Sequence, residues 1–288
     1  MFGLLLTIKI GLDPTLFEVG GLEVSWHGLF TAVGVVVGVG VAAWFARRAG
    51  FPEDTIYNVA LALVIGGIIG ARGLFVLEHL DEFRDHPSDV FDLNAGGISI
   101  YGALIGGTIG AWLYAIIRRM PNIPRGADVA GLGAIMGMAI GRIACLTEGD
   151  IFASTTDLPW GVVYTQSNSP SFGIAEPQHP AVAYELIGDL LIFALLVFIY
   201  YRVNRAGVTF FAWMFLYGLL RVLVSFLRLD DIVFAGLRTA QIIAIGAMPF
   251  GLAGMVYLLR TPSQERRPTR AERRRRLREG AAKEPPRG

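Results

Sequence analysis

Residues 128–146 read DVAGLGAIMGMAIGRIACL, and this stretch decides the fold. Its apolar run is close to the ~20 residues that a helix needs to cross the hydrocarbon core of a membrane. Arg142 interrupts the run in its last third. An ionised side chain costs roughly 2.5 to 3.5 kcal/mol at the centre of a membrane helix, so such residues usually face a polar interior and serve a function. The stretch therefore predicts a membrane helix that carries a functional cation.

The rest of the chain repeats this pattern. Of its 288 residues, 53% are apolar and only 17% are charged, and the mean hydropathy is +0.53. This composition excludes a water-soluble globular domain. The predicted fold is all-α, a polytopic membrane protein built as a bundle of seven transmembrane helices. The six further stretches with the length of a span are residues 27–46, 56–77, 97–117, 182–201, 208–227 and 239–259.

Basic residues in the connections predict the orientation, because Lys and Arg collect in cytoplasmic loops. Arginines follow the first, third and fifth stretches, whereas residues 78–96 hold only Arg84 and no Lys, and residues 147–180 hold neither Lys nor Arg. This alternation places the N-terminus outside and the C-terminus in the cytoplasm. The cytoplasmic arginines are Arg47, Arg48, Arg118, Arg119, Arg125, Arg202 and Arg205, with ten more after residue 259.

The same reading divides the chain into three parts. We expect residues 1–26 to form an outer N-terminal segment, residues 27–260 the seven-helix transmembrane domain that carries the functional site, and residues 261–288 a disordered basic tail in the cytoplasm. An outer loop at residues 147–181 is either a lid over the site or a plain extracellular loop. The single cysteine, Cys145, gives no disulfide framework and no zinc-type cluster. We expect neither a metal nor a cofactor.

Polar residues within the apolar stretches gather on one side of the predicted membrane. The orientation places Arg72, Arg142 and Arg221 in the outer halves of their spans, where they would converge on one anion. His27, Tyr101, Tyr184 and Glu185 lie near the same surface. One outward-facing polar cavity accounts for this distribution. The alternative is that arginines near helix ends extend to the lipid headgroups. This alternative is weaker for Arg221, because Tyr217, Ser225 and Arg228 share its helix face and a polar stripe of that length should face protein or water.

Glycines at four-residue spacing predict close helix packing. Gly133, Gly137 and Gly141 form such a ladder on the fourth stretch, and Gly66/Gly70 and Gly102/Gly106/Gly110 repeat it. Small residues at this spacing let helices approach closely in lipid. Because Gly141 precedes Arg142, the guanidinium group is expected on a rigidly packed helix.

Several motifs together resemble the prolipoprotein diacylglyceryl transferase family. Residues 141–152, GRIACLTEGDIF, resemble its signature, in which Gly-Arg-Ile is followed by a small residue, Asn and then an acidic residue. Four more blocks stand in the family's order, and the resemblance covers about residues 15–260. The blocks are Ser25–Gly28, Tyr101–Gly107, His179–Glu185, and Tyr217–Arg221 with Arg228 beyond.

The resemblance implies a bacterial enzyme of the cytoplasmic membrane. Such an enzyme transfers the diacylglyceryl group of phosphatidylglycerol to the lipobox cysteine of a preprolipoprotein, forming a thioether and releasing glycerol phosphate. Its partners would be these two substrates and membrane lipid, with no nucleic acid. Arg142 and Arg221 would hold the phosphate, and His27 or Tyr101 would assist proton removal. Arg72, Gly102 and Tyr217 would also bind the lipid, with support from Glu148, Asp150, His179, Tyr184, Glu185 and Arg228.

The sequence departs from the family pattern in ways that leave two points open. His27 stands where the first block commonly has Tyr, and Tyr101 stands where some members have His, so the identity of the base is undecided. Cys145 replaces the usual Asn. These changes keep a non-catalytic lipid-binding homologue as an alternative, and an anion channel or transporter is a further one. The remaining departures are Asp150 for Glu, Ala153 for Gly and Val182 for Gln.

Overall fold

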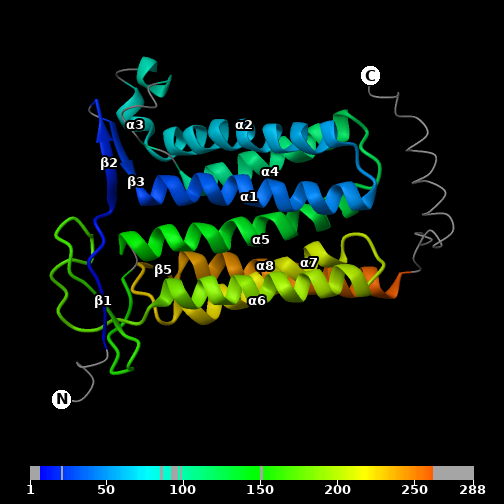
Figure 1. Cartoon of the computed structure of the whole chain (residues 1–288). Helices are drawn as coiled ribbons and strands as arrows, with labels where there is room; N and C mark the ends of the chain where they lie inside the picture. Colours follow the sequence, from blue (N-terminus) through cyan, green and yellow to red (C-terminus); the bar gives the residue numbers. More distant parts are fainter. Residues whose placement is uncertain are drawn as a thin grey trace, which may run out of the picture.

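Seven long helices form the body of the part of the chain that the structure describes (Figure 1). The structure is a computed structural model, and it describes residues 7–20, 22–84, 87–91, 97, 99–149 and 152–261. Two short elements, α3 (Leu80–Phe83) and the 3-10 helix η2 (Pro87–Phe91), follow the second long helix. The long helices are α1 (Trp26–Ala49), α2 (Glu53–Glu78), α4 (Ile100–Ile117), α5 (Ile123–Glu148), α6 (Ala181–Arg202), α7 (Val208–Ser225) and α8 (Thr239–Arg260).

The helices have the length and composition of membrane spans. Six of them are long and apolar enough to cross a bilayer, and α4 contributes a shorter apolar helix, residues 101–117. The predicted helical, polytopic architecture is therefore supported. The number of crossings and the direction of the termini remain predictions.

Short strands accompany the helices, so the all-α prediction was incomplete. They form three two-stranded sheets within the described residues. All lie at one end of the bundle (Figure 1), which we call the strand end; helices α1, α4, α6 and α8 begin there. The pairs are β1 (Ile8–Ile10) parallel to β4 (Val162–Tyr164), β2 (Thr15–Val19) antiparallel to β3 (Leu22–Ser25), and β5 (Ile232–Phe234) antiparallel to β6 (Leu237–Arg238).

Glycine contacts join the long helices in pairs, as the four-residue spacing predicts. On α1, a Cβ atom at Gly34 would lie 2.8 Å from the carbonyl oxygen of Gly137 on α5. Between α2 and α4, a Cβ at Gly66 would lie 2.4 Å from the carbonyl oxygen of Gly106. These distances leave no room for a side chain, so the backbones themselves touch. The start of α1 is thereby fixed beside the end of α5.

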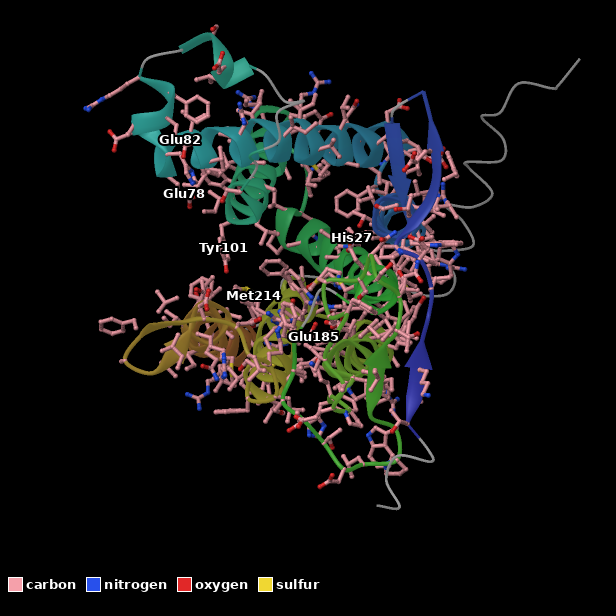
Figure 2. The ribbon with its side chains drawn as sticks, turned by 90° about the vertical axis from the view of Figure 1, so that its left-hand side faces the viewer. His27, Glu78, Glu82, Tyr101, Glu185 and Met214 are labelled. Carbon is pink, nitrogen blue, oxygen red and sulfur yellow. The ribbon has the colours of Figure 1, made fainter. Side chains whose placement is uncertain are left out.

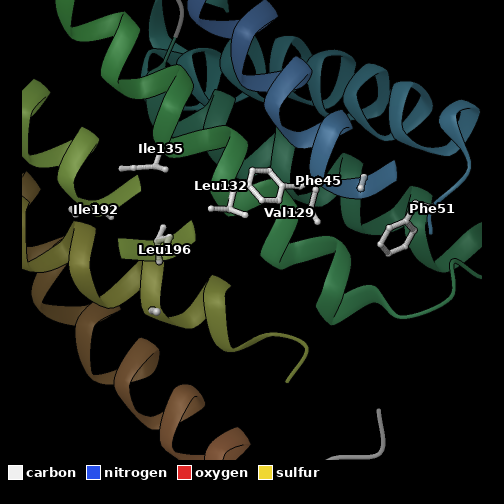
Figure 3. Close-up of a cluster of buried hydrophobic side chains, with 9 residues drawn as sticks. Phe45, Phe51, Val129, Leu132, Ile135, Ile192 and Leu196 are labelled. Carbon is white, nitrogen blue, oxygen red and sulfur yellow. The ribbon is translucent and has the colours of Figure 1, made fainter. Parts of the chain in front are cut away.

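The apolar core lies between α1, α5, α6 and α7 (Figure 3). Leu132 and Ile135 of α5 and Leu196 of α6 have no exposed surface, and Phe45 of α1 packs with them. Away from this core the helices expose many apolar side chains, as expected for a surface that faces lipid. The core therefore ties α5, which carries Arg142, to the helices on both of its sides.

A buried carboxylate links α5 to the beginning of α7. Asp128 accepts backbone hydrogen bonds from Gly207 and Phe210, each 2.9 Å long. An acidic side chain at a helix N-terminus satisfies N–H groups that lack partners within the helix. Asp128 therefore fixes where α7 starts, and with it the height of Tyr217 and Arg221 along the bundle.

We predict that Gly66→Val weakens the contact between α2 and α4. The new side chain would overlap the Gly106 backbone, and such overpacking typically costs about 1 to 3 kcal/mol. The midpoint of thermal unfolding, followed by tryptophan fluorescence in detergent, should fall. Gly40→Val is the matched control, because nothing lies within 4 Å of a Cβ built at Gly40. Equal midpoints for the two variants would contradict the proposed packing.

The N-terminal segment is tied to the loop between α5 and α6 through Asp13. Its carboxylate accepts hydrogen bonds from the Thr15 backbone at 2.9 Å, from Gln166 at 3.0 Å and from Asn168 at 3.3 Å. The Thr15 N–H, followed by the two amides, lowers the pKa of Asp13 below its ordinary value. The ionised carboxylate is thus the form that holds the segment in place.

The Asp13 contacts predict that the attachment of the N-terminal segment depends on pH. A depressed pKa in the folded state gives stability that is present above the unfolded pKa of about 3.9 and is lost as the pH falls through the folded value. Amide hydrogen exchange at β1 and β4, corrected for intrinsic rates, should therefore rise at acid pH. Asp13→Asn should remove this rise, while Asp157→Asn in the same loop should keep it. An unchanged acid response in Asp13→Asn would refute the assignment.

Candidate functional site

Three arginines meet at one buried carboxylate, Glu185, which is 1% exposed. Arg142 Nε lies 2.9 Å from Glu185 Oε2. Arg221 Nη1 bonds Glu185 Oε1, and Arg228 Nη1 lies 3.5 Å from the same oxygen. The three guanidinium groups come from α5, from α7 and from the residues just after α7. We call these four residues the arginine cluster.

The cluster lies near the strand end of the bundle. Arg142 stands six residues before the end of α5, and Glu185 stands four residues after the start of α6. At 1.5 Å per residue, these positions lie roughly 6 to 9 Å from the helix ends. Arg221 stands four residues before the end of α7. The charges therefore lie about two turns or less from one end of the bundle.

Two further polar groups extend the cluster inward. Tyr217 accepts a hydrogen bond of 3.4 Å from Arg142 Nη2 through its hydroxyl. Asp189, one turn beyond Glu185 on α6, is fully buried, and its Oδ2 lies 3.9 Å from Arg142 Nε. Neither carboxylate oxygen of Asp189 makes a hydrogen bond within the described part of the chain. Arg142 is thus held between α6 and α7.

The outer side of the cluster is held by the connection between α7 and α8. Arg228 makes two hydrogen bonds to the Asp230 carboxylate, from Nε at 2.7 Å and from Nη2 at 3.0 Å. Arg238 donates to the backbone oxygens of Asp230 and Ser225. Arg238 therefore fixes the end of α7, and Asp230 fixes the Arg228 fork.

The charge arrangement suits the binding of an anion. Each guanidinium group carries five N–H donors, so the two oxygens of Glu185 occupy only part of the donors around them. The side chains of Arg142, Arg221 and Arg228 retain between 12% and 18% exposure. Guanidinium groups bind the oxygens of carboxylates and phosphates in pairs. Glu185, Asp189 and Asp230 lie beside the three arginines and balance their charges, while the guanidinium groups keep a partly exposed edge.

His27 and Glu148 form a second polar contact at the strand end. His27 Nδ1 lies 2.6 Å from Glu148 Oε2. Ser25 caps α1 by accepting a hydrogen bond from Gly28, which fixes the turn that carries His27. Ser169 donates to the carbonyl of Glu148 at 2.8 Å. The contact joins the beginning of α1 to the end of α5.

Arg72 lies apart from the arginine cluster, contrary to the prediction that three arginines converge. Its guanidinium donates to the carbonyl oxygens of Asp89, Val90 and Gly97 in the connection from α2 to α4. It also stacks on Phe83, with its carbon 5.2 Å from the ring centre. Backbone carbonyl oxygens accept hydrogen bonds from a guanidinium group, as phosphate oxygens do. Through these contacts Arg72 holds the connection between α2 and α4 in place. Its predicted role in lipid binding stays untested.

Two further predicted site residues, Tyr101 and Gly102, lie in the first turn of α4. Ser99 caps this helix and accepts a hydrogen bond from the Gly102 backbone. A Cβ at Gly102 would lie 2.2 Å from the carbonyl of Gly70, so close packing alone explains this glycine. Tyr101 is 39% exposed. Viewed from the strand end, Tyr101, His27 and Glu185 lie around the middle of the molecule (Figure 2).

His179 and Tyr184 belong to a separate contact at the start of α6. Trp160 donates to the Tyr184 hydroxyl at 2.7 Å, and His179 Nδ1 lies 3.4 Å from the same oxygen. Trp160 and Tyr184 line an apolar cavity of about 410 Å³ with residues of β1 and β4. Asp150, the remaining predicted residue, lies outside the described residues. No group of His, Cys, Asp and Glu that could hold a metal occurs among the residues described.

A sequence profile of the prolipoprotein diacylglyceryl transferases matches residues 14–257, which is most of the chain and includes the whole arginine cluster. The chain belongs to the prolipoprotein diacylglyceryl transferase family. This agrees with the resemblance seen in the sequence blocks around Arg142, Glu185 and Arg221.

Curated relatives named phosphatidylglycerol–prolipoprotein diacylglyceryl transferase match over nearly their full length. The protein from Trichormus variabilis is 33% identical, with 85% of this chain and 89% of the relative covered. That from Dehalococcoides mccartyi is 31% identical, with coverages of 89% and 97%. That from Clostridioides difficile is 30% identical, with coverages of 86% and 96%.

Sequence reasoning missed the residues that hold the cluster from outside the spans. Asp230 and Arg238 lie in a short connection of mixed charge, which gave no topological signal. A signal existed in the spacing: Asp230 follows Arg228 by two residues, close enough to bind the same guanidinium. Asp128 was read only as the start of a span, although a carboxylate there requires partners.

We predict that Glu185→Gln destabilises the protein and abolishes activity. The three arginines would lose their shared buried counter-charge, and breaking such a pair typically costs about 3 to 5 kcal/mol. Asp230→Asn is the matched control, since Asp230 is 34% exposed and pairs near the surface contribute only about 0 to 1 kcal/mol. The free energy of unfolding, measured in detergent, should fall much more for Glu185→Gln than for Asp230→Asn. A Glu185→Gln protein as stable as Asp230→Asn would show that the cluster does not depend on this carboxylate.

Proposed function

We propose that this chain transfers the diacylglyceryl group of phosphatidylglycerol to the lipobox cysteine of a preprolipoprotein, forming a thioether and releasing glycerol phosphate. The observation that carries the proposal is the arginine cluster, since three guanidinium groups gather on Glu185 within two turns of a helix-bundle end. The names of the relatives match this reaction. They favour an enzyme over a channel or a non-catalytic homologue.

Arg142 and Arg221 would bind the lipid phosphate. The headgroup reaches the cluster at its partly exposed edge, while the acyl chains extend along the apolar helices. Charge builds on the phosphate oxygen as the carbon–oxygen bond breaks. Cations fixed in a water-poor site then stabilise the transition state more than the bound lipid. The contact of Arg142 with Glu185 and Tyr217 supports this role, because it restricts the orientation of the fork.

The substrate thiol needs activation, since a free cysteine has a pKa near 8.5 and the thiolate is the nucleophile. His27 is the leading base, because an imidazole accepts protons near neutral pH. Tyr101 is the second candidate, and it lies on the other side of the middle of the molecule from His27 in Figure 2. A base at the strand end would meet a peptide that arrives from outside the membrane.

The strand end would face away from the cytoplasm of a bacterial cell, in its cytoplasmic membrane. The opposite end carries the arginines in the last turns of α1 and α6 and those just after α4 and α6, as expected for a cytoplasmic surface. This orientation brings the cluster to the outer leaflet, where secreted precursors emerge. The outer N-terminal segment and the loop before α6 would then cover the site, joined by the Asp13 contacts.

A transfer assay tests the function. Purified protein is given phosphatidylglycerol labelled in one acyl chain, with a synthetic lipobox peptide that carries either Cys or Ser at the acceptor position. Label should pass to the Cys peptide alone, because only a thiol forms the thioether at a useful rate. Saturable lipid binding without transfer would identify a lipid-binding homologue and overturn the proposal.

We predict that Arg142→Ala abolishes transfer while the protein still inserts and folds. Arg142→Lys should recover little activity, because an ammonium group cannot reproduce the planar fork. Arg47→Ala is the control: Arg47 forms an exposed ion pair with Glu53 at the opposite end. Retained transfer in Arg142→Ala, measured with the Cys peptide, would remove Arg142 from the site.

A further inference from the structure

We propose that Glu148 positions His27 as the base of the proposed transfer, so that the two residues act as a carboxylate–imidazole pair. The inference deepens the proposed function and rests on it. It starts from the contact of 2.6 Å between His27 Nδ1 and Glu148 Oε2. Glu148 is the last residue of α5, the helix that carries Arg142, and His27 lies in the first turn of α1.

Both helix ends are fixed by the backbone. Close contact of Gly34 and Gly38 with Gly137 and Gly133 holds α1 and α5 together. Gly149 ends α5 in the left-handed conformation, at φ 73°. Beside it, Ser171, which is buried, donates to the Gly149 carbonyl. The contact therefore lies between two rigid elements, unlike an ordinary pair of surface side chains.

The antiparallel arrangement of α1 and α5 brings two helix ends of opposite partial charge together. The C-terminus of a helix carries partial negative charge and its N-terminus carries partial positive charge. Glu148 brings its carboxylate to the N-terminus of α1, and His27 brings its ring to the C-terminus of α5. The two side chains therefore meet where the start of α1 lies beside the end of α5.

The contact selects one form of the imidazole. An ionised carboxylate only accepts hydrogen bonds, so Nδ1 must carry the proton in this contact and Nε2 is left with its lone pair. Nδ1 is buried, whereas the whole side chain is 40% exposed, which leaves the opposite edge of the ring accessible. The ring orientation gives no aligned hydrogen bond. At 2.6 Å, however, the lone pairs of an unprotonated Nδ1 and of the carboxylate oxygen would repel each other, so the contact favours a proton on Nδ1.

In the proposed step, His27 carries the thiol proton to the leaving group. Nε2 of His27 takes the proton of the cysteine thiol, and the sulfur attacks the glyceryl carbon that bears the phosphate. The carbon–sulfur bond forms as the carbon–oxygen bond breaks, and its electron pair stays on the phosphate oxygen near Arg142 and Arg221. The imidazolium then returns the proton to the departing glycerol phosphate. Glu148 stabilises the imidazolium and exchanges no proton itself, so it is a positioning residue.

A double-mutant cycle tests the coupling in the full chain, reconstituted with phosphatidylglycerol and assayed with the Cys peptide. Glu148→Gln and His27→Gln should each lower kcat/KM at least ~10-fold, since general-base catalysis contributes 10²–10⁴-fold. In the His27→Gln background, Glu148→Gln should add no more than a ~2-fold loss. Glu53→Gln, at the opposite end, should behave like the wild type. An equal loss from Glu148→Gln with and without His27 would overturn the proposal.

A second readout needs no turnover. The chain has four histidines, so nitrogen NMR of protein labelled at histidine can assign His27 through the signal lost in His27→Gln. The wild type should show the form protonated at Nδ1, and Glu148→Gln should shift it toward the form protonated at Nε2. A His27 tautomer that is the same in the wild type and in Glu148→Gln would refute the pairing. If the wild type labels no Cys peptide, the proposed function fails on its own, and the NMR result still decides whether Glu148 sets the ring.

Discussion

The sharing of Glu185 by three arginines is the interaction on which the rest of the strand end depends. Burying guanidinium groups costs several kcal/mol per ion unless a counter-charge and hydrogen bonds offset the loss of water. Glu185 supplies that charge from the first turns of α6, while Arg142 and Arg221 approach from α5 and α7. These helices must therefore keep a fixed height relative to one another.

The packing away from the cluster provides this fixed height. The apolar core around Leu132 and Leu196 holds α5 against α6, and the Asp128 cap sets where α7 begins. Glycine contacts bring α1 against α5, so that His27 reaches Glu148. The same features that keep the bundle closed thus place the arginine cluster and an imidazole at one end. In the proposed reaction, one binds the leaving phosphate and the other removes the thiol proton.

Much of this could be predicted from the sequence. Long apolar stretches give the helices, because bilayer thickness fixes their length, and costly charges within them point to Arg142, Arg221 and Glu185. The prediction that Arg72 converges with Arg142 and Arg221 was wrong. The depth of a residue along a span does not tell which neighbouring helix its side chain faces. Arg72 binds backbone carbonyls of the connection from α2 to α4. The pairing of β1 with β4 was missed because it joins segments about 150 residues apart in the sequence. The other two strand pairs and the Asp230 contact with Arg228 are local, but they lie in short segments outside the apolar stretches.

The central claim is that Arg142 and Arg221 form the phosphate site. The most direct test is an electron cryo-microscopy structure of the protein in lipid nanodiscs that contain phosphatidylglycerol. The account predicts headgroup density whose phosphate oxygens lie within hydrogen-bond distance of both Arg142 and Arg221, with Glu185 behind them. A headgroup bound elsewhere, for example at Arg72, with the arginine cluster empty, would contradict it.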